Sequence, residues 1–173
     1  LLNLIDMLPR DPENDTLVFL GDLIDRGADA PGCVSHILQL CNENPERVIC
    51  LRGNHEQMLM DFLEGFSNLW LTPVVGGERT FEQYTRQSLR VDSEQDLEAA
   101  RAMFEQSFPP EHLAFMQDLP FYYEDDYAIY VHAGLDEGKH PRDSSQQSLL
   151  WMRDMDFYKN YKGKPCVFGH TPT

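Results

Sequence analysis

The chain has 173 residues, 29 of them acidic and 14 of them lysine or arginine, which gives a formal net charge of −15 with the histidines counted as neutral. With 42% hydrophobic residues the chain can bury one core, so length and composition exclude a disordered tail and predict a single domain over residues 1–173. The acidic excess argues against nucleic-acid and anionic-membrane partners, because phosphate-rich surfaces are bound by lysine and arginine.

Residues 1–8 have the pattern of the end of an amphipathic helix, which Pro9 terminates. There is neither an initiator methionine nor a secretory signal pattern here, so we expect that upstream sequence is absent. No apolar run approaches the roughly 20 residues that cross a bilayer. Four cysteines without a C-x-x-C pair favour neither disulfides nor a thiolate zinc site, and we expect a cytoplasmic protein: Cys33, Cys41, Cys50 and Cys166.

Four short segments share one pattern, an apolar run of strand length followed at once by glycine beside a polar residue. Runs without polar alternation are typical of strands that are buried on both faces. The polar residues then fall at the carboxyl ends of the strands, where ligands bind in open α/β sheets. The segments TLVFL-GD, RVICL-RGNH, YAIYV-HAG and PCVF-GH occupy residues 16–22, 47–55, 127–134 and 165–170.

Helices are predicted between these strands. Asp29 and Pro31 mark the start of one helix, residues 56–62 form the start of a second, and Ser93 with Asp96 resembles a capping box before a third. A short helix follows at 111–118. We expect residues of about 65–120 to form a helical insertion over the sheet, although 65–92 carries no clear pattern.

The strand ends collect Asp22, Asn54, His132 and His170. Taken singly, the first two are ordinary turn residues and the histidines are more often satisfied core residues. Taken together they form a set of oxygen and nitrogen donors without thiolate, which suits manganese, iron or zinc as a divalent ion. Four unrelated turns would not each need such a residue, so the joint pattern predicts a metal site.

These motifs resemble the calcineurin-like metallophosphoesterases, in particular the phosphoprotein phosphatase family with its bacterial protein serine/threonine phosphatases. The resemblance rests on GDLIDRG, RGNHE, VHAGL and GHT in this order, and GDxxDRG followed by GNHE is its most specific part. It implies an α/β fold, a β-sandwich of mixed sheets flanked by helices. It also implies two divalent ions, for which manganese is favoured and iron or zinc is an alternative.

By position, the resemblance implies that Asp22 bridges the two metals, and that the other ligands of the second metal are Asn54, His132 and His170. The family's first motif, G-D-x-H-G, supplies ligands to the first metal but does not occur in this chain. We therefore expect a fragment that lacks an upstream portion, with closing strands missing after Thr173 as well.

The resemblance implies that His55 protonates the leaving group and that Asp25 hydrogen-bonds this histidine. Arg26 matches an arginine that binds the phosphate, and Arg153 in LLWMRD resembles a second one. Arginine suits this role because its planar guanidinium offers two parallel donors to phosphate oxygens. Without the motifs, both arginines would be read as surface ion-pair residues of an acidic protein.

Three functions remain open. The first is metal-dependent hydrolysis of phosphate monoesters by a metal-activated water, with protein phosphoserine and phosphothreonine as substrates. The second is hydrolysis of dinucleoside tetraphosphates, by a related branch that has alanine at Asp25 and aspartate at Glu56. The third is an inactive module that binds a phosphorylated partner. We expect a phosphorylated protein or a small phosphoester as partner, and neither nucleic acid nor membrane.

Overall fold

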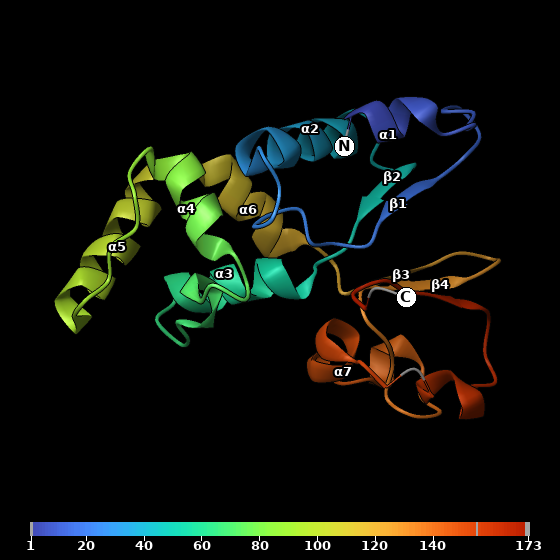
Figure 1. Ribbon diagram of the computed structural model, residues 1–173. Helices are drawn as coiled ribbons and strands as arrows, with labels where there is room; N and C mark the ends of the chain where they lie inside the picture. Colours follow the sequence, from blue (N-terminus) through green and yellow to red (C-terminus); the bar gives the residue numbers. More distant parts are fainter. Residues whose placement is uncertain (1, 155, 172–173) are drawn as a thin grey trace.

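The computed structural model describes residues 2–154 and 156–171, and Leu1, which belongs to the predicted first helix, lies outside these residues. The chain folds into helices and short strands, and a run of helices separates the first two strands from the other three (Figure 1). Their bounds are α1 Leu2–Met7, β1 Leu17–Phe19, α2 Ala30–Glu43, β2 Val48–Cys50, α3 Asn54–Leu63, η1 Leu69–Leu71, α4 Gly77–Thr85, α5 Glu94–Ser107, α6 Pro110–Asp118, β3 Tyr122–Glu124, β4 Ile129–Val131, η2 Pro141–Asp143, α7 Gln146–Trp151, η3 Phe157–Asn160 and β5 Cys166–Val167.

The strands form two small sheets. β1 and β2 pair in parallel, with Leu17 opposite Val48, and α2 forms the crossover between them. In the second sheet β4 lies in the middle, antiparallel to β3 and parallel to β5. The carboxyl ends of the parallel strands meet at one edge, because His132 after β4 bonds through Nδ1 to the Leu20 carbonyl after β1 at 2.6 Å.

All four predicted strands are present, but they are shorter than the apolar runs, and β3 was not predicted. The expectation that the strands are buried on both faces is right only in part. Ile129 and Val131 of β4 are buried, whereas β1 is only half-buried and Val167 of β5 is 41% exposed. Strand position alone does not explain the difference, because β2 also pairs with one strand only among the described residues. Its Val48 and Cys50 are buried, and Cys50 packs with Ile37 of α2 and with Leu119.

The predicted helix starts are confirmed. The Asp29 carboxylate accepts a hydrogen bond from the Gly32 amide at the start of α2, and the Ser93 hydroxyl accepts one from Asp96 at the start of α5. α4 and α7 were not predicted. α1 is confirmed as a helix. Of its predicted apolar residues, Ile5 is half-buried and Leu8, which follows the helix, is exposed.

The largest core lies where α3, α4 and α5 pack around η1, on one side of the strands (Figure 1). Trp70, Phe62, Phe81 and Phe104 are its largest fully buried side chains. A separate core lies between β4 and α7. No helix in the described part of the chain is long and apolar enough to cross a membrane.

His112 of α6 ties this helix to its two neighbours. Its Nε2 lies 3.0 Å from the Ser35 hydroxyl of α2, and its Nδ1 lies 2.9 Å from the Tyr84 hydroxyl of α4. The Ser35 hydroxyl donates to the Pro31 carbonyl, so it accepts from His112 Nε2–H, and Nδ1 is left to accept from Tyr84. Burial lowers the pKa of His112 and keeps the ring in this neutral form.

We predict that Tyr84→Phe lowers the free energy of unfolding by about 1 to 3 kcal/mol at neutral pH, because the buried Nδ1 loses its donor. The bond needs a neutral ring. The penalty is therefore full above the ordinary histidine pKa and shrinks as the pH falls through the lowered pKa of His112. Urea unfolding of both proteins over a pH series measures this, and a penalty that is constant in acid would contradict the assigned bond.

Candidate metal centre and catalytic cleft

Two glycines let the loops after β1 and β2 approach closely. Gly21 has a φ of 92°, and a Cβ atom built on it would lie 2.6 Å from the Gly53 Cα. A Cβ atom on Gly53 would in turn lie 2.7 Å from Glu56 Oε2. Only glycine fits such an approach, and it brings the residues that follow, Asp22 and Asn54, to the same point.

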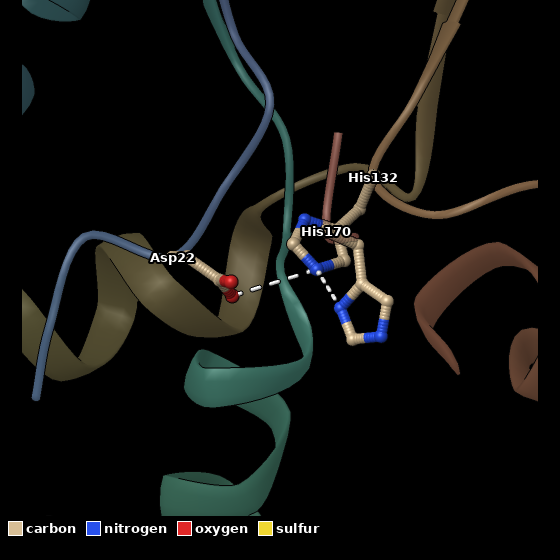
Figure 2. Close-up of side chains that lie close together, drawn as sticks. All are labelled: Asp22, His132 and His170. Atoms are coloured by element: carbon tan, nitrogen blue, oxygen red, sulfur yellow. Dashed lines mark hydrogen bonds and ion pairs between the residues drawn. The ribbon is translucent and has the colours of Figure 1, made fainter. Parts of the chain in front are cut away.

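The structure brings the four strand-end residues together. His132 Nε2 lies 2.9 Å from Asn54 Oδ1, 3.1 Å from His170 Nδ1 and 3.5 Å from Asp22 Oδ1. One ligand atom each from Asp22, His132 and His170 lies within 4.8 Å of the others. Figure 2 shows these three side chains pointing toward one another from separate segments.

The chemistry of this donor set fits a divalent cation. The Leu20 carbonyl can only accept, so His132 Nδ1 carries a proton, and Nε2, which faces Asn54 Oδ1, is the ring nitrogen left to act as a metal ligand. Burial, with the nearby charge of Arg153, lowers the pKa of His170 to about 4, so the ring of His170 is neutral at neutral pH. Acceptor atoms with too few protons among them repel one another, and a cation removes that repulsion.

His55 follows Asn54 of the cluster in the sequence, and its ring faces Asp25. His55 Nδ1 hydrogen-bonds Asp25 Oδ2, and both side chains are buried. Burial opposes the charged form of His55, but the bond to Asp25 and the charges of Asp22 and Asp25 outweigh burial and raise the pKa of His55. A histidine held in this way stays protonated to higher pH, as a general acid requires.

Both predicted phosphate arginines reach the same cleft. Arg26 and Arg153 line a cleft of about 340 Å³ together with Asp22, Asn54, His55 and His170. Neither guanidinium has an ion-pair partner among residues 2–154 and 156–171, although the chain has an excess of acid. Two unpaired cations at one cleft favour an anionic ligand and not the surface ion pairs that the acidic composition suggests.

Three residues with contacts to this site were not assigned a role from the sequence. Glu56 is fully buried and accepts hydrogen bonds from backbone N–H groups of both site loops. Glu56 is the third residue of α3 and bonds the N–H of the N-cap residue Gly53, but without serine or threonine at the N-cap the sequence carries no capping-box signal here. Trp70 and Thr80 both bond the Asp25 carboxylate. They come from the stretch without a clear pattern, and no local signal indicated them.

Comparison with known proteins shows the family. The calcineurin-like phosphoesterase family matches residues 1–173, so the chain belongs to the calcineurin-like phosphoesterases. This match confirms the expected α/β fold class, and the family implies divalent metal ions as cofactors.

Individual relatives match shorter stretches. The chain is 48% identical over 62 residues to serine/threonine-protein phosphatase 1 of Salmonella typhimurium, which covers 35% of this chain and 26% of that protein. It is 43% identical over 49 residues to a protein of Caenorhabditis elegans, covering 28% of this chain and 19% of that one. A protein serine/threonine phosphatase structure from Saccharomyces cerevisiae aligns with 95% of this chain and 44% of its own, at 18% identity and a TM-score of 0.47. The chain thus spans less than half the length of these proteins.

We predict that Asp22→Ala and His132→Ala each weaken Mn²⁺ binding by at least about tenfold, because each removes a donor atom from the cluster. His55→Ala is the matched control. It keeps the backbone N–H that bonds Asp22 Oδ1 and removes only a ring that faces Asp25, so metal content should stay the same. Calorimetric titration of the full-length protein with Mn²⁺ measures this. Equal losses in all three variants would show that the ligand assignment is wrong.

Proposed function

We propose that the protein hydrolyses phosphate monoesters, with phosphoserine and phosphothreonine side chains of proteins as its substrates. The supporting observation is one cleft that is lined by donor-cluster residues, by His55 of the buried Asp25–His55 pair and by two arginines without ion-pair partners among the described residues. These are the parts that a phosphomonoesterase needs. GDLIDRG and RGNHE contribute Asp22, Asp25, Arg26, Asn54 and His55, and the other residues come from VHAGL, LLWMRD and GHT.

Asp22, Asn54, His132 and His170 would hold the divalent ions, for which we propose manganese. When bound, such ions polarise phosphoryl oxygens and lower the pKa of water, so that it attacks at neutral pH. Arg26 and Arg153 would bind and orient the phosphate through paired N–H donors. His55 would donate the proton from Nε2 to the leaving alkoxide, while Asp25 holds the Nδ1–H and the orientation of the ring.

The leaving group separates this function from dinucleoside tetraphosphate hydrolysis. A serine alkoxide is a strong base and needs a proton as the bond breaks, whereas a nucleotide phosphate leaves as a weakly basic anion. The buried Asp25–His55 pair is thus needed for the monoester and of little use for the dinucleotide. Asp25 and Glu56 also differ from the residues expected of the dinucleotide branch.

We predict that the full-length protein with Mn²⁺ hydrolyses a phosphoserine peptide with a kcat/KM at least about tenfold above that for diadenosine tetraphosphate. Phosphate release from both substrates under the same conditions measures this ratio. The opposite ratio would favour the dinucleotide hydrolase. Tight binding of the phosphopeptide without turnover would favour the inactive binding module.

We predict that Asp25→Asn moves the basic limb of the kcat profile to lower pH. A general acid works only below its pKa, and the raised pKa of His55 depends on the bond to Asp25 and on its charge. Removing that charge lets burial lower the pKa of His55, so activity is lost at a lower pH than in the wild type. kcat for the phosphoserine peptide over a pH series measures the limb, and an unmoved limb would contradict the role of this pair.

A further inference from the structure

Two residues of the stretch 65–92, which has no clear sequence pattern, hydrogen-bond the carboxylate of Asp25. Trp70 of η1 donates from Nε1 to Asp25 Oδ1 at 2.9 Å, and the Thr80 hydroxyl of α4 donates to the same oxygen at 3.0 Å. All three side chains are fully buried. The second oxygen, Oδ2, remains for His55 Nδ1.

We infer that Trp70 and Thr80 are positioning residues for the general acid, an inference that rests on the proposed function. A carboxylate can rotate about its Cβ–Cγ bond and can bond a histidine with either oxygen. Two donors on Oδ1 fix this rotation and direct Oδ2 to Nδ1 of His55. The His55 ring is thereby oriented with Nε2 available to the leaving group.

Thr80 also fixes the main chain of Asp25. Its hydroxyl accepts the Asp25 N–H at 2.8 Å and donates its own proton to Asp25 Oδ1. Asp25 has a φ of 85°, a left-handed conformation that non-glycine residues adopt only where the surroundings hold them. One hydroxyl therefore sets both the backbone conformation and the carboxylate orientation of this residue.

Trp70 is itself held tightly. Its ring packs against Phe62 and Phe104, with ring centroids 5.2 and 5.0 Å away. Gly77 also lies close to the indole, since a Cβ atom built on Gly77 would lie 2.7 Å from Trp70 Nε1. A buried indole N–H needs a hydrogen-bond acceptor. Here the acceptor is the carboxylate that bonds His55, so the packing of the ring also fixes the orientation of Asp25.

The experiment compares two leaving groups in the full-length protein with Mn²⁺. Trp70→Phe keeps an aromatic ring and removes the N–H, and Thr80→Val keeps the shape and removes the hydroxyl. Expulsion of p-nitrophenolate needs little acid catalysis, whereas expulsion of a serine alkoxide depends on it. We expect kcat for the phosphoserine peptide to fall by about tenfold or more, because misplacing a catalytic group is costly. kcat for p-nitrophenyl phosphate should change by less than about threefold.

Thr80→Ser restores the hydroxyl and should restore turnover of the phosphopeptide. Thr85→Val is the matched control, since this hydroxyl of the same helix bonds the Phe81 and Gln87 carbonyls and not Asp25. Thr85→Val should leave kcat for both substrates unchanged. Equal losses on both substrates in Trp70→Phe and Thr80→Val would mean that the two residues only stabilise the fold, and the inference would be wrong.

A second measurement does not depend on turnover. The proton between His55 Nδ1 and Asp25 gives a downfield ¹H NMR signal, which His55→Ala identifies by removing it. We expect Trp70→Phe and Thr80→Val to shift or broaden this signal and Thr85→Val to leave it in place. If the wild type hydrolyses neither substrate, the proposed function fails, and the signal still decides whether Trp70 and Thr80 orient the pair. A signal unchanged in both variants overturns the inference.

Discussion

The site depends on one buried carboxylate, that of Glu56. It accepts hydrogen bonds from the backbone N–H groups of Asp22 at 2.9 Å, Leu23 at 2.7 Å and Gly53 at 2.8 Å. Burial and the charge of Asp22 raise the pKa of Glu56 to about 7, while the three N–H donors favour its charged form. Without this side chain three N–H groups would lack a partner, so Glu56 holds the loops after β1 and β2 together.

The same interactions hold a strained backbone. Asp22, Asp25 and His170 have φ values of 59°, 85° and 64°. This left-handed conformation costs about 1 to 3 kcal/mol for each non-glycine residue that adopts it. The neighbouring bonds explain how each is held. Glu56 takes the N–H of Asp22, Thr80 takes that of Asp25, and the Gly169 amide beside His170 donates to the His132 carbonyl at 2.9 Å. Strain and support occur together at the residues that carry the proposed chemistry.

The features that could be predicted from the sequence are those that residues close together in the chain determine. Strand runs that end in glycine and a polar residue located the four residues that the structure brings together and that we propose as ligands, and Asp29 and Ser93 marked helix starts through local caps. The sequence did not predict the bonds of Trp70 and Thr80 to Asp25, which span 45 and 55 residues and follow from packing around η1 and α4. β3 was not predictable either, because its segment has no alternating pattern and becomes a strand through its pairing with β4. Roles such as that of His55 came from family resemblance and not from the residues alone.

The local charge of the cleft differs from that of the chain. A net charge of −15 would on average repel a phosphate, yet two carboxylates at the site have hydrogen-bond partners within it. Asp25 is bonded to His55, Trp70 and Thr80 and faces away from solvent, and Asp22 belongs to the donor cluster. What remains directed at a ligand is Arg26 and Arg153 with the charge of any bound ion. On the proposed function, an acidic protein would bind an anionic ester in this way, because carboxylates held by histidine and by a bound ion would leave the arginines unopposed.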